Sequence, residues 1–120
     1  MEKIYILCPV SMANDKIREE LQSYVSFMED QGFEVYYPAR DTEQGATPME
    51  ICRQNFKAIR EADRVDIFYS DKSLGSHLDI GCLVEEHLRG NKKEVNIVSG
   101  TITNDTTGYQ ILELINQMGI

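Results

Sequence analysis

The sequence predicts an α/β fold in which a parallel sheet of about four to five strands is covered by helices on both faces. Short β-favouring runs alternate along the chain with stretches of helical periodicity, and almost no β-hairpin signal interrupts this alternation. Because crossovers between parallel strands are right-handed, few topologies remain. The 120 residues, of which 42% are hydrophobic, suit one domain with one core.

The first strand and the first helix are predicted near the amino terminus. Residues 3–8 form an apolar run that Pro9 stops, as in a buried strand. Residues 14–31 carry apolar side chains at helical spacing, and Gly32 follows as a helix stop. The apolar stripe of this helix consists of Ile17, Leu21, Tyr24, Val25 and Met28.

A second strand and a second helix follow. Residues 33–37 read as a strand closed by Pro38, and residues 39–46 read as a polar loop. The tetrapeptide at 47–50, Thr-Pro-Met-Glu, has the form of a capping box with proline at the first helical position, so it predicts a helix that runs to about Ala62. Its inward-facing side chains are Ile51, Asn55, Ile59 and Ala62.

The remaining elements repeat the alternation. Residues 65–69 are predicted to be a third strand, 70–75 a turn, and 76–89 a helix that Gly90 ends. The apolar face of that helix is Ile80, Leu83, Val84 and Leu88. A fourth strand at 95–98 and a final helix at 109–118, with Ile111, Leu114, Ile115 and Met118 facing inward, complete the pattern.

This order of elements predicts a doubly wound arrangement, Rossmann-like or flavodoxin-like. In such sheets ligands bind outside the carboxyl ends of the strands, near the point where the strand order reverses. The segments 8–14, 38–45 and 70–79 follow the first three strands, so we expect them to meet at one site. The dinucleotide-binding pattern of three glycines does not follow the first strand, which disfavours a nicotinamide-binding domain.

The segment 70–81 contains the most informative candidate residues for binding or catalysis. A strand end, a glycine-containing turn and a helix start follow one another there, so the first backbone N–H groups of the helix are free to meet an anion. Asp79 is predicted in or near the first helical turn, where the helix dipole favours an ionised carboxylate. An ionised carboxylate in a cleft can act as a nucleophile.

Four segments taken in order resemble the nucleoside 2-deoxyribosyltransferase family, which includes the deoxynucleoside 5′-monophosphate N-hydrolases. They are Lys-Ile-Tyr-Ile at 3–6, Gly-Phe-Glu-Val at 32–35, Ile-Arg-Glu-Ala-Asp at 59–63 and Gly-Ser-His-Leu-Asp-Ile-Gly at 75–81. The resemblance extends over roughly the first hundred residues. It implies one domain of this kind over residues 1–120 and a nucleoside or nucleotide as the small-molecule ligand.

The resemblance also implies roles for individual residues. Asp79 stands where the family has a glutamate nucleophile that attacks the anomeric carbon and breaks the N-glycosidic bond. Tyr5 matches a tyrosine that orients this nucleophile, and Asn55 stands where transferases often carry an acid for the departing base. The amide of Asn55 cannot donate a titratable proton as a carboxylic acid can, so protonation of the departing base would need Asp71, His77 or water.

The remaining candidate residues concern binding. By the resemblance, Ser73, Gly75 and Ser76 match positions that hold sugar hydroxyls or a 5′-phosphate. His77 and Asp71 lie in the same turn, and Pro9 and Arg40 follow the first and second strands at the edge that faces the site. An alternative function is a non-catalytic nucleotide-binding or sensing module that uses the same cleft.

Composition narrows the classes of partner. The chain has 12 basic and 20 acidic residues, a net charge of −8, which disfavours polymeric nucleic acid as a ligand. The three cysteines are isolated and lie in apolar patterns, so they are expected to be buried thiols. The two histidines are too far apart for a helix-face metal pair, and His87 is expected at a helix surface or rim. We expect no metal and no cofactor.

Location and assembly complete the sequence-based expectations. The amino terminus is too short and too acidic for a signal peptide, and no apolar run approaches the roughly 18 residues of a membrane span, so a cytoplasmic protein is expected. The family resemblance implies a homodimer or higher homo-oligomer. The candidate interface residues are Tyr24, Phe27, Phe56 and Leu88.

Overall fold

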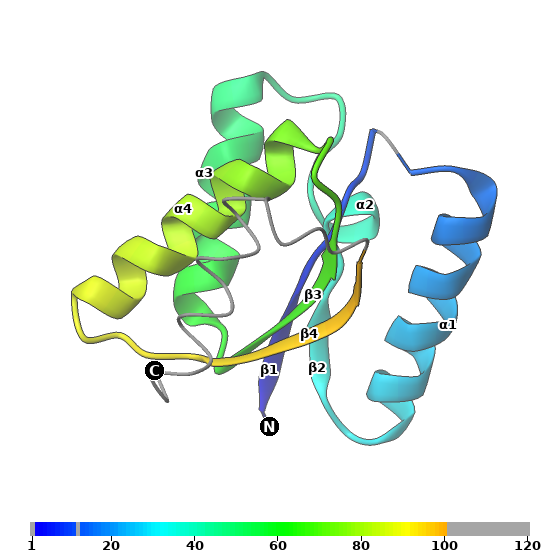
Figure 1. Ribbon diagram of the computed structural model, residues 1–120, viewed down its shortest axis with the longest axis horizontal. Coiled ribbons are helices and arrows are strands. Elements are labelled where there is room, and N and C mark those ends of the chain that lie inside the picture. Colours follow the sequence, from blue (N-terminus) through cyan, green and yellow to red (C-terminus); the bar gives the residue numbers. More distant parts are fainter. Residues whose placement is uncertain (1, 12, 101–120) are drawn as a thin grey trace.

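The computed structural model describes residues 2–11 and 13–100, and within them a four-stranded parallel sheet lies between two layers of helices (Figure 1). The strands are β1 (Lys3–Leu7), β2 (Glu34–Tyr36), β3 (Arg64–Tyr69) and β4 (Glu94–Gly100), in the spatial order β2-β1-β3-β4. All pairs are parallel, which confirms the predicted fold class. The helix predicted at 109–118 lies outside the described residues.

Helix α1 (Asp15–Asp30) covers one face of the sheet. It begins where the Asn14 side chain accepts a hydrogen bond from the Ile17 N–H at 2.9 Å. It stops before Gly32, whose φ of +96° is a left-handed conformation that glycine adopts without steric cost, so the predicted helix stop is confirmed. Leu21, Val25 and Met28 are buried, and they pack against the sheet in a core that includes Ile4, Ile6, Val35 and Phe68.

Helices α3 (Pro48–Glu61) and α4 (Leu74–Leu88) cover the opposite face. The predicted cap of α3 is confirmed, because the Thr47 hydroxyl accepts from the Glu50 N–H at 3.2 Å. Ser73 caps α4 in the same way, accepting from the Ser76 N–H at 3.2 Å. The core on this face includes Tyr5, Leu7, Ile59, Val65, Ile67, Ile80 and Leu83.

Two differences from the predicted elements affect the region of the expected site. The polar loop at 39–46 contains a short helix, α2 (Pro38–Asp41), which forms because Pro38 has the φ of a first helical residue and the Asp41 carboxylate accepts from the Tyr37 N–H at 2.8 Å. Helix α4 begins at Leu74 rather than at residue 76 because Ser73 serves as its cap. That second shift changes where Asp79 lies within the helix.

The carboxyl end of α4 also differs from the prediction. Leu88 was expected to face inward, but it is 78% exposed, whereas His87, expected at the surface or rim, is buried. The chain turns at Gly90 and returns beneath the helix end, where the Lys93 N–H donates to His87 Nε2 at 3.3 Å. The expectation of three buried cysteines holds for Cys8, but Cys52 and Cys82 are only half-buried.

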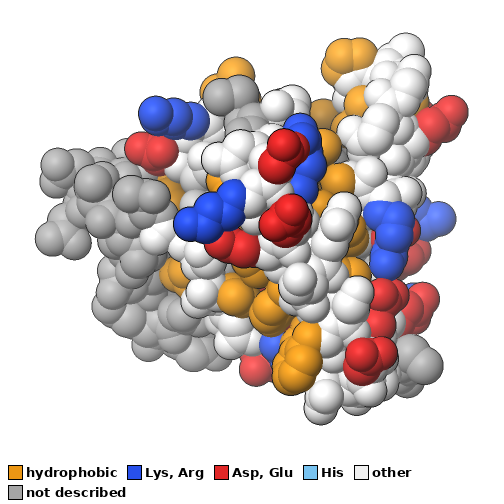
Figure 2. Space-filling view, turned by 90° about the vertical axis from the view of Figure 1, so that its right-hand side faces the viewer, with side chains coloured by type: hydrophobic (Ala, Val, Ile, Leu, Met, Phe, Trp, Pro, Cys, Tyr) orange, Lys and Arg blue, Asp and Glu red, His pale blue; other side chains and the backbone are white. Residues whose placement is uncertain are grey.

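Charged side chains of both signs surround small hydrophobic patches on the face that Figure 2 shows. Of the candidate interface residues, Phe27 is 59% exposed and Leu88 lies at the surface, whereas Tyr24 and Phe56 are half-buried. Tyr24 also donates a hydrogen bond to Asp66. The oligomeric state stays a prediction. No helix within the described residues is long and apolar enough to span a membrane.

Candidate functional site

A cavity of about 230 Å³ lies at the carboxyl ends of β1 and β3, where the strand order reverses. The loops after β1, β2 and β3 all contribute to it, so the structure brings together the three predicted segments. Helices α3 and α4 supply the remaining walls. The residues that line the cavity are Cys8, Val10, Ser11, Pro38, Gln44, Ile51, Asn55, Ser73, Gly75 and Asp79.

Asp79 provides the carboxyl group of this cavity, and its environment differs from the prediction. Since α4 begins at Leu74, Asp79 lies in the second turn, and the first turn contains no acidic residue. The helix dipole acts mainly on the first turn, so it does not hold this carboxylate in its ionised form. Asp79 is 6% exposed, and burial raises its pKa from 3.8 to about 6.

Tyr5 is the hydrogen-bond partner of Asp79. Its hydroxyl donates to Asp79 Oδ2 at 2.7 Å, across 74 residues of sequence, and this bond lowers the pKa of Asp79 against the effect of burial. The Tyr5 ring is fully buried and lies stacked on Tyr36, with ring centroids 5.6 Å apart. Burial and the neighbouring carboxylate raise the pKa of Tyr5 well above 10, so the phenol is a permanent donor near neutral pH.

Cys8 adds a thiol to the same cavity. Burial, and then the charge of Asp79, raise its pKa to about 12. A thiol with such a pKa is protonated near neutral pH and is a poor nucleophile. Of the Cys8 thiol and the Asp79 carboxyl group, which both line the cavity, only the carboxyl group is ionised near neutral pH.

Asn55 lies on the α3 wall of the cavity, as its inward-facing position predicts. Its side-chain oxygen accepts a hydrogen bond from the Thr42 hydroxyl at 2.5 Å. Thr42 is buried and also contacts the Tyr36 hydroxyl, at 2.6 Å. Asn55 therefore belongs to a hydrogen-bonded group that connects α3 to the loop after α2.

The turn at the start of α4 contributes some of its predicted residues and not others. Ser73 and Gly75 line the cavity, and Ser76 lies just behind them with a buried hydroxyl that has no hydrogen-bond partner among the described residues. His77 does not line the cavity. Its Nδ1 lies 2.7 Å from the Ser73 carbonyl oxygen, and its Nε2 lies 3.3 Å from the Tyr69 hydroxyl.

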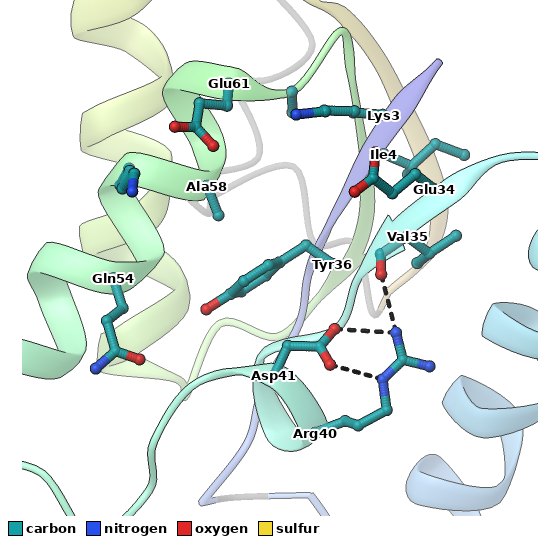
Figure 3. Close-up of a pocket in the computed structure, with 12 residues that line it drawn as sticks. Lys3, Ile4, Glu34, Val35, Tyr36, Arg40, Asp41, Gln54, Ala58 and Glu61 are labelled. Atoms are coloured by element: carbon teal, nitrogen blue, oxygen red, sulfur yellow. Dashed lines mark hydrogen bonds and ion pairs between the residues drawn. The ribbon is translucent and has the colours of Figure 1, made fainter. Parts of the chain in front are cut away.

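Arg40 lies outside this cavity. It lines a separate pocket of about 470 Å³ between β2 and α3, where its guanidinium binds Asp41 and the Val35 carbonyl oxygen (Figure 3). Glu29 is a further ion-pair partner, at 3.2 Å. The structure therefore places Arg40 in a different pocket from Asp79, and it does not bring this predicted residue to the cavity. Pro9 and Asp71 do not line the cavity either, although Cys8 and Val10, on either side of Pro9, do.

Sequence reasoning missed Gln44, Ser11 and Thr42. Gln44 and Ser11 lie within the loops expected to meet at the site, so their position provided a signal, but neither residue type suggests chemistry alone. Thr42 lies in a stretch predicted to be loop, and nothing local indicates that it is 4% exposed. Its hydroxyl contacts Asn55 of α3 and Tyr36 of β2, so its burial depends on contacts between different elements.

The raised pKa of Asp79 predicts an unusual dependence of stability on pH. Between about pH 4 and 6 the folded protein retains a proton on Asp79 that the unfolded chain releases, so stability falls as pH rises through this range. We expect Asp79→Asn to gain on the order of 2 kcal/mol relative to the native protein between pH 4 and pH 8. Urea unfolding at several pH values measures this gain.

Asp30→Asn provides the matched control for this experiment, because Asp30 is exposed at the end of α1. It should show no such gain. A stability difference between Asp79→Asn and the native protein that stays constant from pH 4 to 8 would show that the carboxyl group is not desolvated as the structure indicates.

The fold and the cavity together define a class of protein: a doubly wound parallel α/β domain with a buried carboxyl group at the point where strand order reverses. No protein-family model matches the sequence, and no curated protein does. Similarity is found among solved structures. A 2-deoxyribosyltransferase from Bacillus psychrosaccharolyticus has a TM-score of 0.61 and 18% identity, over 85% of this chain and 77% of that one.

A CMP N-glycosidase from Clostridium botulinum is also similar, with a TM-score of 0.54 and 16% identity, over 97% of this chain and 99% of the other. At such identities the similarity shows a common fold. The chain therefore has a nucleoside 2-deoxyribosyltransferase-like fold, and the resemblance seen in the sequence is confirmed at that level.

Proposed function

We propose that this protein cleaves or transfers at the N-glycosidic bond of a nucleoside, a deoxynucleoside or one of their 5′-monophosphates, with Asp79 as the nucleophile. The observation that carries the proposal is the buried Asp79 carboxyl group, bonded to Tyr5 at 2.7 Å and open to a cavity at the edge of the sheet. The two similar folds, a 2-deoxyribosyltransferase and a CMP N-glycosidase, support the same chemistry.

The proposed reaction has two steps. The ionised carboxylate of Asp79 attacks the anomeric carbon, the bond from this carbon to the base nitrogen breaks, and its electron pair leaves with the base. A covalent ester between Asp79 and the sugar results. Water, or a second base, then attacks the same carbon and releases the carboxylate. Tyr5 holds Oδ2 throughout, which leaves Oδ1 as the attacking oxygen.

The cavity offers few groups that could protonate the departing base. Asp79 is the one carboxylic side chain among the described residues that line the cavity, and Asn55 is an amide that donates a hydrogen bond but cannot transfer a proton at neutral pH. The proton that neutralises the base therefore comes from water. This same observation favours the second candidate function, a module that binds nucleotides in this cleft without cleaving them.

One experiment separates the two functions. The protein is incubated with a panel of ribonucleosides, deoxyribonucleosides and their 5′-monophosphates, and free base is measured by chromatography. Release of base identifies an enzyme, and a second free base added to the mixture distinguishes transfer from hydrolysis. Binding of a nucleotide by calorimetry with no base released would instead establish the binding module.

The pH dependence of base release is a further prediction. Because Asp79 must be ionised to attack, the rate should rise with pH through about 6, the folded pKa of this carboxyl group. In Tyr5→Phe the hydrogen bond that lowers this pKa is lost, so the acid limb of the pH–rate profile should move to higher pH. Tyr36→Phe keeps the ring that stacks on Tyr5 and should leave the limb in place. An unshifted limb in Tyr5→Phe would count against the assigned partner.

A 5′-phosphate should strengthen binding through the amino terminus of α4. The Ser73 hydroxyl and carbonyl accept from the N–H groups of Ser76 and His77, which leaves those of Leu74 and Gly75 without intrahelical partners. We expect a nucleoside 5′-monophosphate to bind more tightly than its nucleoside in calorimetric titrations. Equal affinities would indicate that this turn contacts sugar hydroxyls instead.

A further inference from the structure

Thr42 lies at the centre of a directed set of hydrogen bonds beside the cavity. Its side chain is 4% exposed, and its hydroxyl donates to Asn55 Oδ1 at 2.5 Å. A threonine hydroxyl has one proton, and an amide oxygen has none to give. The contact between Thr42 and the Tyr36 hydroxyl, at 2.6 Å, must therefore have Tyr36 as the donor. The protons point from Tyr36 to Thr42 and from Thr42 to Asn55.

This direction fixes which end of the Asn55 amide is left for a ligand. The oxygen is occupied by Thr42, and no described residue accepts a hydrogen bond from Nδ2. Because Asn55 lines the cavity, the polar group that it offers there is an N–H donor. Rotation of the amide by half a turn would require the Thr42 and Tyr36 hydroxyls to exchange their donor and acceptor roles as well, so the three side chains hold the orientation together.

Thr42 also fixes a second amide, that of Gln44, through its backbone. Gln44 Nε2 donates to the carbonyl oxygens of Pro38, at 2.7 Å, and of Thr42, at 3.0 Å. Both amide protons are thereby used, and no described residue donates to Gln44 Oε1. Gln44 lines the same cavity, so it offers an acceptor where Asn55 offers a donor.

We propose that Thr42 is a positioning and specificity-determining residue that orients the Asn55 and Gln44 amides to read the edge of a nucleobase. This inference rests on the proposed function for the identity of the ligand. A donor and an acceptor that line the same cavity complement a ligand edge with an acceptor beside a donor. Cyclic amides and amidines have such an edge, and nucleobases carry it on the side that pairs with other bases.

Calorimetric titration tests this role in an Asp79→Asn background, in which no probe is turned over. The probes are the 5′-monophosphates of cytidine, uridine, adenosine and inosine, with ribose 5-phosphate as a probe that lacks a base. Thr42→Val removes the hydroxyl at nearly constant shape, and Thr42→Ser retains it. We expect Thr42→Val to weaken the tightest-binding nucleotide about 10- to 100-fold, because the Asn55 amide is then free to rotate.

Two comparisons separate positioning from a structural role. Ribose 5-phosphate should bind Thr42→Val within about twofold of the parent, and Thr42→Ser should restore nucleotide affinity to within about threefold. Equal weakening of both probes, or no weakening of either, overturns the proposal. Failure of the parent to bind any nucleotide overturns it together with the proposed function. Nucleotide binding that depends on the Thr42 hydroxyl, in a native protein that releases no base, supports the inference while rejecting the enzyme.

Discussion

Asp79→Ala is expected to abolish base release while the protein stays folded. Removal of a nucleophile on which both steps depend costs on the order of 10³- to 10⁶-fold in kcat. Asp79→Asn should lose as much, because it keeps the size of the side chain and the acceptor for Tyr5 but cannot form the ester. The loss in Asp79→Asn cannot then be attributed to a cavity or to an unpaired phenol. Free-base chromatography on the best substrate of the panel measures both variants.

Asp79→Glu tests whether the length of the side chain at this position limits the attack on the anomeric carbon. Glutamate is longer by one methylene, about 1.5 Å, and a misplacement of ~1 Å at a reacting centre can cost on the order of 100-fold in rate. The side chain borders the cavity, so the added group has space on one side. If reach limits the native protein, Asp79→Glu should equal or exceed its rate. Base release that persists unchanged in Asp79→Ala would remove Asp79 as the nucleophile.

Lys93→Met is expected to cause a large loss of stability, of about 2–4 kcal/mol. Lys93 is 5% exposed, and its ammonium group donates to the carbonyl oxygens of Arg60 and Ala62, each at 2.6 Å. These carbonyls lie at the carboxyl end of α3, where a cation also interacts favourably with the helix dipole. Methionine retains most of the apolar stem but leaves both acceptors without this donor.

Lys92→Met is the matched control, since Lys92 is the exposed neighbour in the same turn. Urea unfolding should find it within about 0.5 kcal/mol of the native protein. A loss of less than about 1 kcal/mol in Lys93→Met would show that other donors replace the ammonium group at the end of α3.

The sequence indicated where the site lies better than it indicated which side chains form it. Parallel strands end at a common edge, so the three loops that follow β1, β2 and β3 had to meet once the fold class was known. Asp79 was recognised from the glycine-containing turn and helix start around it and from the family resemblance, and Asn55 from its place on an apolar helical stripe and from the same resemblance. Arg40 was chosen because it follows the second strand at that edge, yet it pairs with Asp41 and Glu29 and lines another pocket. The spacing of residues along the sequence does not show whether a guanidinium such as that of Arg40 binds a ligand or a neighbouring carboxylate.

Local sequence by itself determined the strands, the three long helices and most of their ends within the described residues. Caps such as Thr47 and stops such as Gly32 act over a few residues, so they can be recognised without a fold. The final helix at 109–118 stays a prediction. The acid strength of Asp79, by contrast, depends on its burial and on Tyr5, which is 74 residues distant.

Only the tertiary structure decided which polar groups meet. Thr42 is buried where it contacts Tyr36 of β2 and Asn55 of α3, and His87 is buried because the chain returns beneath α4 after Gly90. Both outcomes depend on contacts between elements rather than on periodicity within one. Hydrogen bonds act over about 3 Å, so the orientation of an amide and the pKa of a carboxyl group depend on the exact positions of the neighbouring side chains. That information exists only once the strands and helices have assembled.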